Sequence, residues 1–261
     1  MSLPFFWIDA FTDRVFSGNP AGVVPLEQWL PDDVMQRIAF ENGLSETAFF
    51  VRNGPGQYHL RWFTPAIEVE LCGHATLASA HVLWRELGET TERIAFASRS
   101  GPLHVTRTGD RLQLNFPSQP AAPATPPDLL LQSLGRPPEW VGRAGTRWLC
   151  VFAEAAEVHR LRPDQALLSR VTPGRMIATA PGEDCDFVSR FFAPDAGVPE
   201  DPVTGSAHCT LTPYWADRLG RTRLHARQVS ARAGELWCEL RGARVTIAGC
   251  AVTYLRGQLA L

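Results

Sequence analysis

Lysine is absent from the 261-residue sequence, and all 25 basic residues are Arg. Without Lys there is no Schiff base to a carbonyl substrate or to pyridoxal phosphate, and no phosphate-binding Lys of a Walker-type loop. The six cysteines form no CxxC pair, so a zinc ribbon is not expected. The formal net charge is −2 with no basic stripe, which argues against nucleic acid or an anionic membrane as partner.

Long apolar runs are also missing, since no stretch approaches the roughly 20 residues that span a bilayer. The N-terminal residues lack a basic leader followed by an apolar segment, so we expect no signal peptide and a cytoplasmic location. The scattered cysteines are then expected to be reduced. Hydrophobic residues make up 45% of the chain, which is enough for a sizeable core.

The chain contains two similar halves joined by a Pro-rich stretch, PSQPAAPATPPD. RWFTP at 61–65 matches RFFAP at 190–194, and a glycine follows in each half, Gly73 and Gly205, with three extra residues in the second copy. We therefore predict a first domain over 1–116, a linker over 117–127 and a second domain over 128–247, with 248–261 packing on the first. Duplicated domains commonly place a site in the crevice between them.

Each half predicts short strands around one helix. Segments rich in β-branched and aromatic residues, bounded by Gly, Asn, Asp or Pro, predict strands at 21–24, 45–51, 58–63, 93–98, 101–109 and 111–116. Residues 31–43 predict a surface helix, with Asp32 near its N-cap and Gly43 past its end. The sequence therefore predicts an α+β fold of two pseudo-symmetric domains.

The central helices are predicted over 73–88 and 205–220. Their first turns are apolar or small all round, as expected for helices enclosed by strands. Pro213 is expected to kink the second helix or to end its first segment. A helix start binds anions through its free N–H groups, so Gly73 and Gly205 are candidate contacts for a small carboxylate; simple helix initiation is the alternative.

Several side chains near these helix starts could act as acids or bases. Glu46 begins a strand, and from the pattern alone we expect it on the solvent face; in a pocket its pKa would be raised, which suits a general acid/base. Asp201, held extended before Pro202, lies at the start of the second helix, where capping is the alternative role. Cys72 and His74 could form a nucleophile pair, but adjacent side chains at a helix start need not meet.

Four segments carry a resemblance to a known family: DAFTDRVFSGNPAGVV (9–24), GLSETAFF (43–50), FTPAIEVELCGHATLASAHVL (63–83) and FFAPDAGVPEDPVTGSAH (191–208). Together they resemble the phenazine-biosynthesis isomerase-like (PhzF) family, in the superfamily of diaminopimelate epimerase and proline racemase. The resemblance implies two domains of similar topology, each a β-barrel-like sheet around a central helix. It also implies an active site between the domains and, commonly, a homodimer.

The same resemblance assigns roles to residues. It carries a catalytic glutamate onto Glu46, and supporting positions onto Gly73, His74, Asp201 and Ser206. The two-thiol epimerases of the superfamily have a Cys–Gly pair at each helix start. Here Cys72 precedes Gly73, but Pro202 stands about where the second thiol would fall, so the two-cysteine mechanism is not expected.

The expected function is a cofactor-independent isomerase, with no metal, that moves a proton on a small carboxylic or amino acid. Glu46 would carry the proton, His74 and Asp201 would orient the substrate, and the backbone at Gly73, Gly205 and Ser206 would bind it. Asn19, in GNPAGVV, is a candidate substrate contact, with a plain turn as the alternative. Two other functions stay open: a racemase, epimerase or dehydratase that uses Cys72, and a ligand-binding protein without chemistry.

Overall fold

The computed structural model describes residues 2–172 and 174–261, and the chain divides into two compact units. The first comprises the residues up to Asn115 together with Ala248–Leu261, and the second comprises Phe116–Ile247. Residues 117–127, expected to be a linker, belong to the second unit, where β9 (Ala122–Pro123) pairs with a neighbouring strand. None of the described helices is long and apolar enough to cross a membrane.

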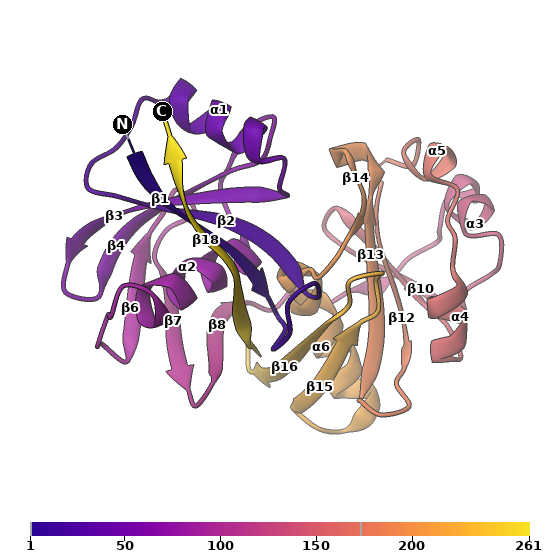
Figure 1. The fold of residues 1–261 in the computed structure, drawn as a ribbon. Coiled ribbons are helices and arrows are strands. Elements are labelled where there is room, and N and C mark those ends of the chain that lie inside the picture. Colours follow the sequence, from indigo (N-terminus) through magenta and orange to yellow (C-terminus); the bar gives the residue numbers. More distant parts are fainter. Residues whose placement is uncertain (1, 173) are drawn as a thin grey trace. The chain divides into compact units, whose positions relative to one another are not determined.

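The first unit is a sheet with one internal and one outer helix. Its elements are β1 (Ser2–Ala10), β2 (Asn19–Leu26), α1 (Asp32–Asn42), β3 (Glu46–Gly54), β4 (Gln57–Phe63), β5 (Glu68–Val69), α2 (Gly73–Arg85), β6 (Arg93–Ala97), β7 (Leu103–Thr108), β8 (Arg111–Pro117) and β18 (Ala251–Ala260). Helix α2 packs against β1, β2, β3 and β18 and is buried along most of its length (Figure 1). The C-terminal strand β18 pairs antiparallel with β1.

The second unit repeats the sheet with its internal helix and has three short helices besides that one. Besides β9 it contains α3 (Asp128–Leu134), β10 (Trp140–Ala144), β11 (Arg147–Val151), α4 (Ala155–Arg160), α5 (Gln165–Leu168), β12 (Arg175–Pro181), β13 (Phe187–Ala193), a 3-10 turn (Pro194–Ala196), β14 (Val198–Asp201), α6 (Gly205–Leu219), β15 (Arg223–Gln228), β16 (Gly234–Arg241) and β17 (Arg244–Gly249). Helix α6 is the counterpart of α2 and is also largely buried (Figure 1).

The two units share one order of elements and one set of strand directions. In the first, β2 is parallel to β3, β3 is antiparallel to β4, and β4 is parallel to β6. In the second, β11 is parallel to β12, β12 is antiparallel to β13, and β13 is parallel to β15. The central helix in each unit follows a short strand, β5 or β14, that pairs with β4 or β13. This agreement supports an internal duplication.

One ion pair is also duplicated at the level of atoms. The Arg61 guanidinium donates two hydrogen bonds to Glu68, both 2.8 Å, and lies 5.1 Å from the ring centre of Phe63. In the second unit Arg190 donates to Glu200 at 2.7 and 2.8 Å and lies 4.9 Å from the ring centre of Phe192. The repeated Arg-x-Phe motif therefore anchors the strand before each central helix to the strand that carries its aromatic ring.

Helix α1 covers one side of the first unit because Met35, Ile38 and Ala39 fall on one face and enter the core. It ends at Gly43, whose φ of 61° is the left-handed conformation that glycine adopts without strain. Asp32 lies near the N-cap, as predicted: Pro31 occupies the N-cap position and Asp32 is the first residue of the helix. The Asp32 carboxylate accepts a hydrogen bond from Arg61 at 2.9 Å.

Helix α6 continues through Pro213, which the sequence predicted to kink it or to end its first segment. A proline has no N–H, so the carbonyl four residues earlier, that of Cys209, has no helical donor. The backbone N–H of Gln119 donates to this carbonyl at 2.9 Å. The helix continues through Pro213 because the segment between β8 and β9, which contains Gln119, replaces the missing bond.

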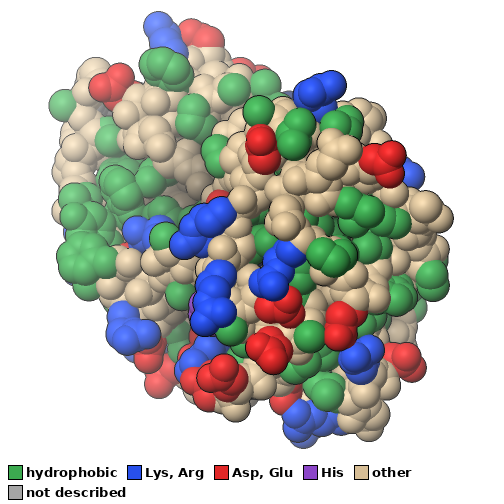
Figure 2. Space-filling view, turned by 90° about the vertical axis from the view of Figure 1, so that its right-hand side faces the viewer, with side chains coloured by type: hydrophobic (Ala, Val, Ile, Leu, Met, Phe, Trp, Pro, Cys, Tyr) green, Lys and Arg blue, Asp and Glu red, His purple; other side chains and the backbone are tan. Residues whose placement is uncertain are grey.

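Charged side chains are mixed on the surface. Figure 2 shows Arg side chains beside acidic ones on one face, with hydrophobic side chains scattered among them. Because the sequence has no Lys, every basic side chain on this face is an Arg.

Candidate active site

Glu46 is the first residue of β3 and lies beside β2, where its backbone pairs with Ala21. The pattern favoured the solvent face for this side chain, and the structure corrects that expectation: the Glu46 side chain is only 19% exposed. The reason is tertiary, because α2 packs against β3 and brings its first turn to this end of the strand. The alternation of the strand alone contains no information about that helix.

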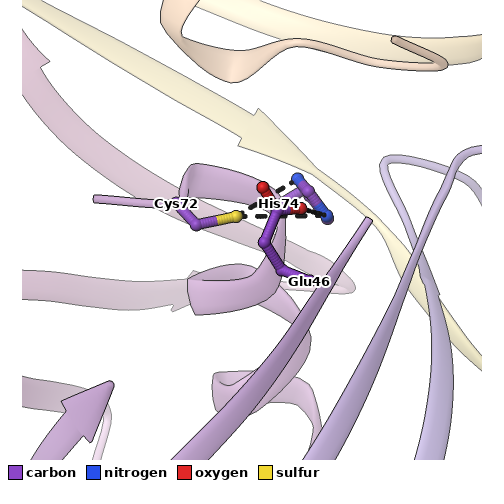
Figure 3. A group of neighbouring side chains, drawn as sticks. All are labelled: Glu46, Cys72 and His74. Atoms are coloured by element: carbon purple, nitrogen blue, oxygen red, sulfur yellow. Dashed lines mark hydrogen bonds and ion pairs between the residues drawn. The ribbon is translucent and has the colours of Figure 1, made fainter. Parts of the chain in front are cut away.

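His74 and Cys72 stand at the start of α2 and meet Glu46 there. The Nε2 atom of His74 lies 3.1 Å from Oε2 of Glu46, and the His74 side chain is 8% exposed. The sulfur of Cys72 lies 3.4 Å from Nδ1 and 4.0 Å from Nε2 of the same ring. Figure 3 shows all three side chains directed toward one another. The expectation that Cys72 and His74 need not meet is therefore wrong, since the extended backbone at Cys72 turns its side chain back over the helix start.

The pKa values of Glu46 and His74 move apart. Burial alone raises the pKa of the Glu46 carboxyl, but the charge of His74 and hydrogen bonds from His74 and Cys72 outweigh it, so the pKa lies below its ordinary value. This corrects the expectation that a pocket would raise it. Burial alone lowers the pKa of His74, while Cys72 and Glu46 raise it well above its ordinary value. At neutral pH the pair is a carboxylate and an imidazolium.

The N-terminal turn of α2 adds backbone donors to this pair. The N–H and the side-chain hydroxyl of Thr76 both donate to the carbonyl of Cys72, at 3.1 and 2.6 Å. The N–H groups of the first helical residues, beginning at Gly73, have no partner inside the helix and carry its positive dipole. The first turn of α2 contains no acidic residue. The arrangement suits an anion or a developing enolate next to Glu46.

Glu46, Cys72 and His74 are also the one group of three or more potential metal ligands found in the described part of the chain. Their ligand atoms lie within 4.8 Å of one another. A metal binds in the plane of an imidazole ring through one nitrogen, whereas Nε2 of His74 already faces Glu46 at 3.1 Å and Cys72 lies closer to Nδ1. The geometry therefore fits an ion pair between Glu46 and His74, with Cys72 beside it, better than chelation.

The start of α6 in the second unit is built from uncharged hydrogen bonds around one acid. Asp201 ends β14, and its carboxylate accepts a hydrogen bond of 2.5 Å from the Thr204 hydroxyl. Gln228 joins the two: its amide donates to the Asp201 carbonyl at 2.7 Å and accepts from the Thr204 N–H at 2.8 Å. Gly205 and Ser206 follow as the first two residues of α6.

Gln228 is a site residue that the sequence reasoning missed. It is fully buried at the end of β15, where the inward positions alternate with half-exposed ones. A glutamine at the inward position of such a strand must find buried partners, since an unpaired amide is costly. The alternation of inward and outward positions along this strand was the signal that could have identified Gln228, because it places the amide on the buried side.

His208 and Asn19 are both fully buried, and they have different surroundings. His208 lies one turn into α6, where Nδ1 is 2.9 Å from the Thr204 carbonyl, and burial lowers its pKa to about 4. Asn19 is the first residue of β2, directly after Gly18, whose φ is 68°. Asn19 thus follows a turn and enters a strand that lies beside the strand of Glu46.

A family model described as phenazine biosynthesis-like protein matches residues 8–257. The chain belongs to this family. A protein of Pseudomonas aeruginosa named as an uncharacterized isomerase is 52% identical over the full length of both chains. The human phenazine biosynthesis-like domain-containing protein is 41% identical, with 99% of each chain covered. The family that the sequence motifs predicted is therefore confirmed.

Solved structures agree with this family and with its fold. A PhzF family protein from Enterococcus faecalis superposes with a TM-score of 0.97 at 44% identity, covering 100% of both chains. A hydroxyproline epimerase from Agrobacterium vitis has a TM-score of 0.64 at 11% identity, over 100% of this chain and 93% of the other. The second similarity concerns the fold alone. The predicted α+β, epimerase-like fold is confirmed.

Proposed function

We propose that the protein is an isomerase that moves a proton on a small carboxylic or amino acid, without a cofactor, with Glu46 as the proton carrier. The single observation that supports this most is the buried Glu46–His74 pair, 3.1 Å apart at the start of α2. The names of relatives point the same way, since the P. aeruginosa protein is called an isomerase. The reaction type and the substrate class are part of the proposal.

The chemistry follows from the charges of the pair. The Glu46 carboxylate removes a proton from a carbon activated by a neighbouring carboxylate or double bond, and the electron pair spreads into the conjugated system. Glu46, now a neutral acid, returns this proton to another carbon of that system, so that no atoms are gained or lost. His74 stays an imidazolium throughout and stabilises the Glu46 carboxylate before the first step and after the second.

The second unit would contribute the rest of the site. In the proposal, the Asp201 carboxylate and the first residues of α6, Gly205 and Ser206, bind the polar groups of the same substrate. The positive dipole of each helix start favours an anionic group of the substrate. The hydrogen bond from Thr204 keeps the Asp201 carboxylate in one orientation, which suits a binding role better than proton transfer.

The decisive experiment is hydrogen exchange into candidate substrates. A panel of small unsaturated and cyclic carboxylic and amino acids is incubated with the protein in D2O and followed by proton NMR. The expected result is exchange or double-bond migration in at least one compound, lost in Glu46→Gln while the compound still binds. Turnover retained by Glu46→Gln would refute the role of Glu46, and no exchange in any compound would favour a binding protein.

A racemase, epimerase or dehydratase that uses Cys72 is the second candidate, because the Cys72 sulfur lies 3.4 Å from His74. It predicts that Cys72→Ser abolishes exchange of the α-hydrogen. The favoured function predicts that Cys72→Ser retains most of the turnover. Running both variants on the same compounds separates the two functions.

A further inference from the structure

The Cys72 thiol has no step in the proposed reaction, yet it contacts both groups that do. Its sulfur lies 3.4 Å from the nearer nitrogen of His74, and within 4.8 Å of the Glu46 carboxylate. The residue is 6% exposed. A buried polar atom in contact with a proton carrier influences that carrier, so the protonation state of Cys72 decides what it can do.

The position of the sulfur relative to the imidazole ring is informative. A group that lies along the N–H bond of one ring nitrogen is much farther from the second nitrogen than from the first. The Cys72 sulfur is almost equally far from both, at 3.4 Å from Nδ1 and 4.0 Å from Nε2. The sulfur therefore lies against the face of the His74 ring. This leaves the S–H available to the Glu46 carboxylate, whose ligand oxygen lies within 4.8 Å and whose pKa Cys72 helps to lower.

The surroundings keep this proton on the sulfur. Burial and the negative charge of Glu46 raise the pKa of the Cys72 thiol to about 11, and the opposing effect of His74 does not reverse this. A thiol base, as in the two-thiol epimerases, would have to ionise beside an existing carboxylate. Cys72 is therefore a donor at neutral pH rather than a base.

We propose that Cys72 is a positioning residue: its thiol stays protonated, packs on the ring of His74 and donates to Glu46, and so holds the carboxylate against the imidazolium. This inference rests on the proposed function of Glu46, since alignment of the Glu46–His74 pair is useful only if Glu46 carries the proton. The Cys–Gly sequence at the helix start has then kept its thiol while the function of that thiol has changed from proton transfer to alignment.

Other charged groups around α2 are directed elsewhere. On β1, the buried Asp9 carboxylate accepts the N–H of Phe16 in the following loop at 2.9 Å. On β18, Arg256 pairs with Glu86 just after the C-terminal end of α2. The side chains that raise the pKa of His74 are Glu46 and Cys72, and of these only Glu46 is charged at neutral pH. A change at Cys72 is thus expected to be felt mainly by this pair.

The test measures protonation in the intact protein without a substrate. Nitrogen NMR of the imidazoles, with His74 identified by its loss in His74→Asn, is followed against pH in the wild type, Cys72→Ala, Cys72→Val and Cys72→Ser. Thiolate absorbance in the ultraviolet, wild type minus Cys72→Ser, reports the state of the sulfur. Cys209→Ala is the matched control, since Cys209 is a buried thiol of α6 whose pKa burial raises to about 11.

The proposal expects no thiolate in the wild type at neutral pH. Cys72→Ala and Cys72→Val should each lower the pH at which His74 loses its proton by about one unit, the equivalent of one hydrogen bond to a charged group. Cys72→Ser, which keeps a donor, should restore most of that shift, and Cys209→Ala should change nothing. Val fills the volume of the thiol, so it supports the test if the Ala variant packs poorly.

Three outcomes would overturn the proposal: a thiolate at neutral pH, an unchanged His74 in both Cys72→Ala and Cys72→Val, or a Ser variant no better than Ala. The function of Glu46 is tested separately by hydrogen exchange. Exchange retained by Glu46→Gln together with a shifted His74 would refute the catalytic proposal and keep the alignment of the pair by Cys72.

Discussion

The two central helices, α2 and α6, begin in the same way but have different side chains at their starts. Each follows a short strand and starts at a glycine, with an extended residue, Cys72 or Thr204, in the N-cap position. At the start of α2 a carboxylate meets an imidazolium. At the start of α6 the Asp201 carboxylate accepts a hydrogen bond from the neutral Thr204 hydroxyl. In the proposed function, one helix start would serve a mobile proton and the other would serve fixed polar contacts.

The histidines of the two helices show this difference most directly. His74 and His208 are both deeply buried, but His74 has a carboxylate 3.1 Å away, whereas the partner of His208 is the backbone carbonyl of Thr204. The pKa of His74 is raised, and burial lowers that of His208 to about 4. A charged partner therefore decides whether a buried histidine is a cation or a neutral structural group.

The largest effect is expected from replacing each of the two acids, Glu46 and Asp201, by its amide. Glu46→Gln should lower the rate of hydrogen exchange into a substrate by about 10³-fold or more, because it removes the proton carrier. Asp201→Asn keeps the shape and one acceptor, so it should act mainly on KM, with a loss of roughly tenfold in kcat/KM. Rates and KM values measured in D2O for both variants test this. A larger loss of kcat in Asp201→Asn would reverse the assignment.

The duplicated ion pair should be more important in the second unit. Arg190→Met leaves Glu200 without its guanidinium and removes the Arg190 donor from the carbonyls of Val158 and Leu161, so the local unfolding free energy should fall by about 3–5 kcal/mol. The Val158 carbonyl keeps the N–H of Leu161.

Arg61→Met is the matched control for this change. Glu68 would keep the Arg99 side chain at 2.8 Å, and the Asp32 partner is exposed, so the loss should be about half as large. Hydrogen exchange of the backbone in β13 and β4 measures both. Equal losses would mean that the contacts to Val158 and Leu161 contribute little.

The histidines predict opposite dependence on pH. For His208, the unfolded chain takes up a proton near 6.5 and the folded chain only near 4, so the second unit should lose up to about 3 kcal/mol as pH falls through this range. For His74 the folded pKa is raised, so its contribution is complete below 6.5 and is lost as pH rises through the raised value.

Backbone hydrogen exchange of α6 and α2 between those pH values tests this sign. His208→Gln should remove most of the acid-side loss in α6, whereas His74→Gln should not. An acid-side loss that survives in His208→Gln would assign it to other groups.

The smallest effect is expected at Pro213. Because Gln119 already donates to the Cys209 carbonyl, Pro213→Ala should change stability by less than about 1 kcal/mol. The matched position of α2 is occupied by His81, where the helix has no such outside donor among the described backbone bonds. His81→Pro should therefore cost about 3 kcal/mol. Thermal denaturation of both variants makes the comparison, and a large loss in Pro213→Ala would contradict it.

Local features were predictable where short-range chemistry decides them. The strands around 45–51 and 58–63 and the helices beginning at Gly73 and Gly205 are where the sequence placed them. Two contacts depend on distant segments: Asp32, near the N-cap as predicted, also accepts a hydrogen bond from Arg61, and Gln119 donates to the carbonyl that Pro213 leaves without a helical donor. Arg61 and Gln119 lie outside the helices concerned, so no sequence pattern within those helices predicts these contacts.

By itself, the sequence determined the repeated plan and the identity of the acids and bases, because strand alternation, helix periodicity and motif residues are properties of neighbours in the chain. Only the tertiary structure decided that Glu46 is buried against His74 and that Cys72 lies on the same ring. It also decided the charge of each histidine. A pKa depends on which groups lie within a few ångströms and on how little water separates them, and packing alone sets both.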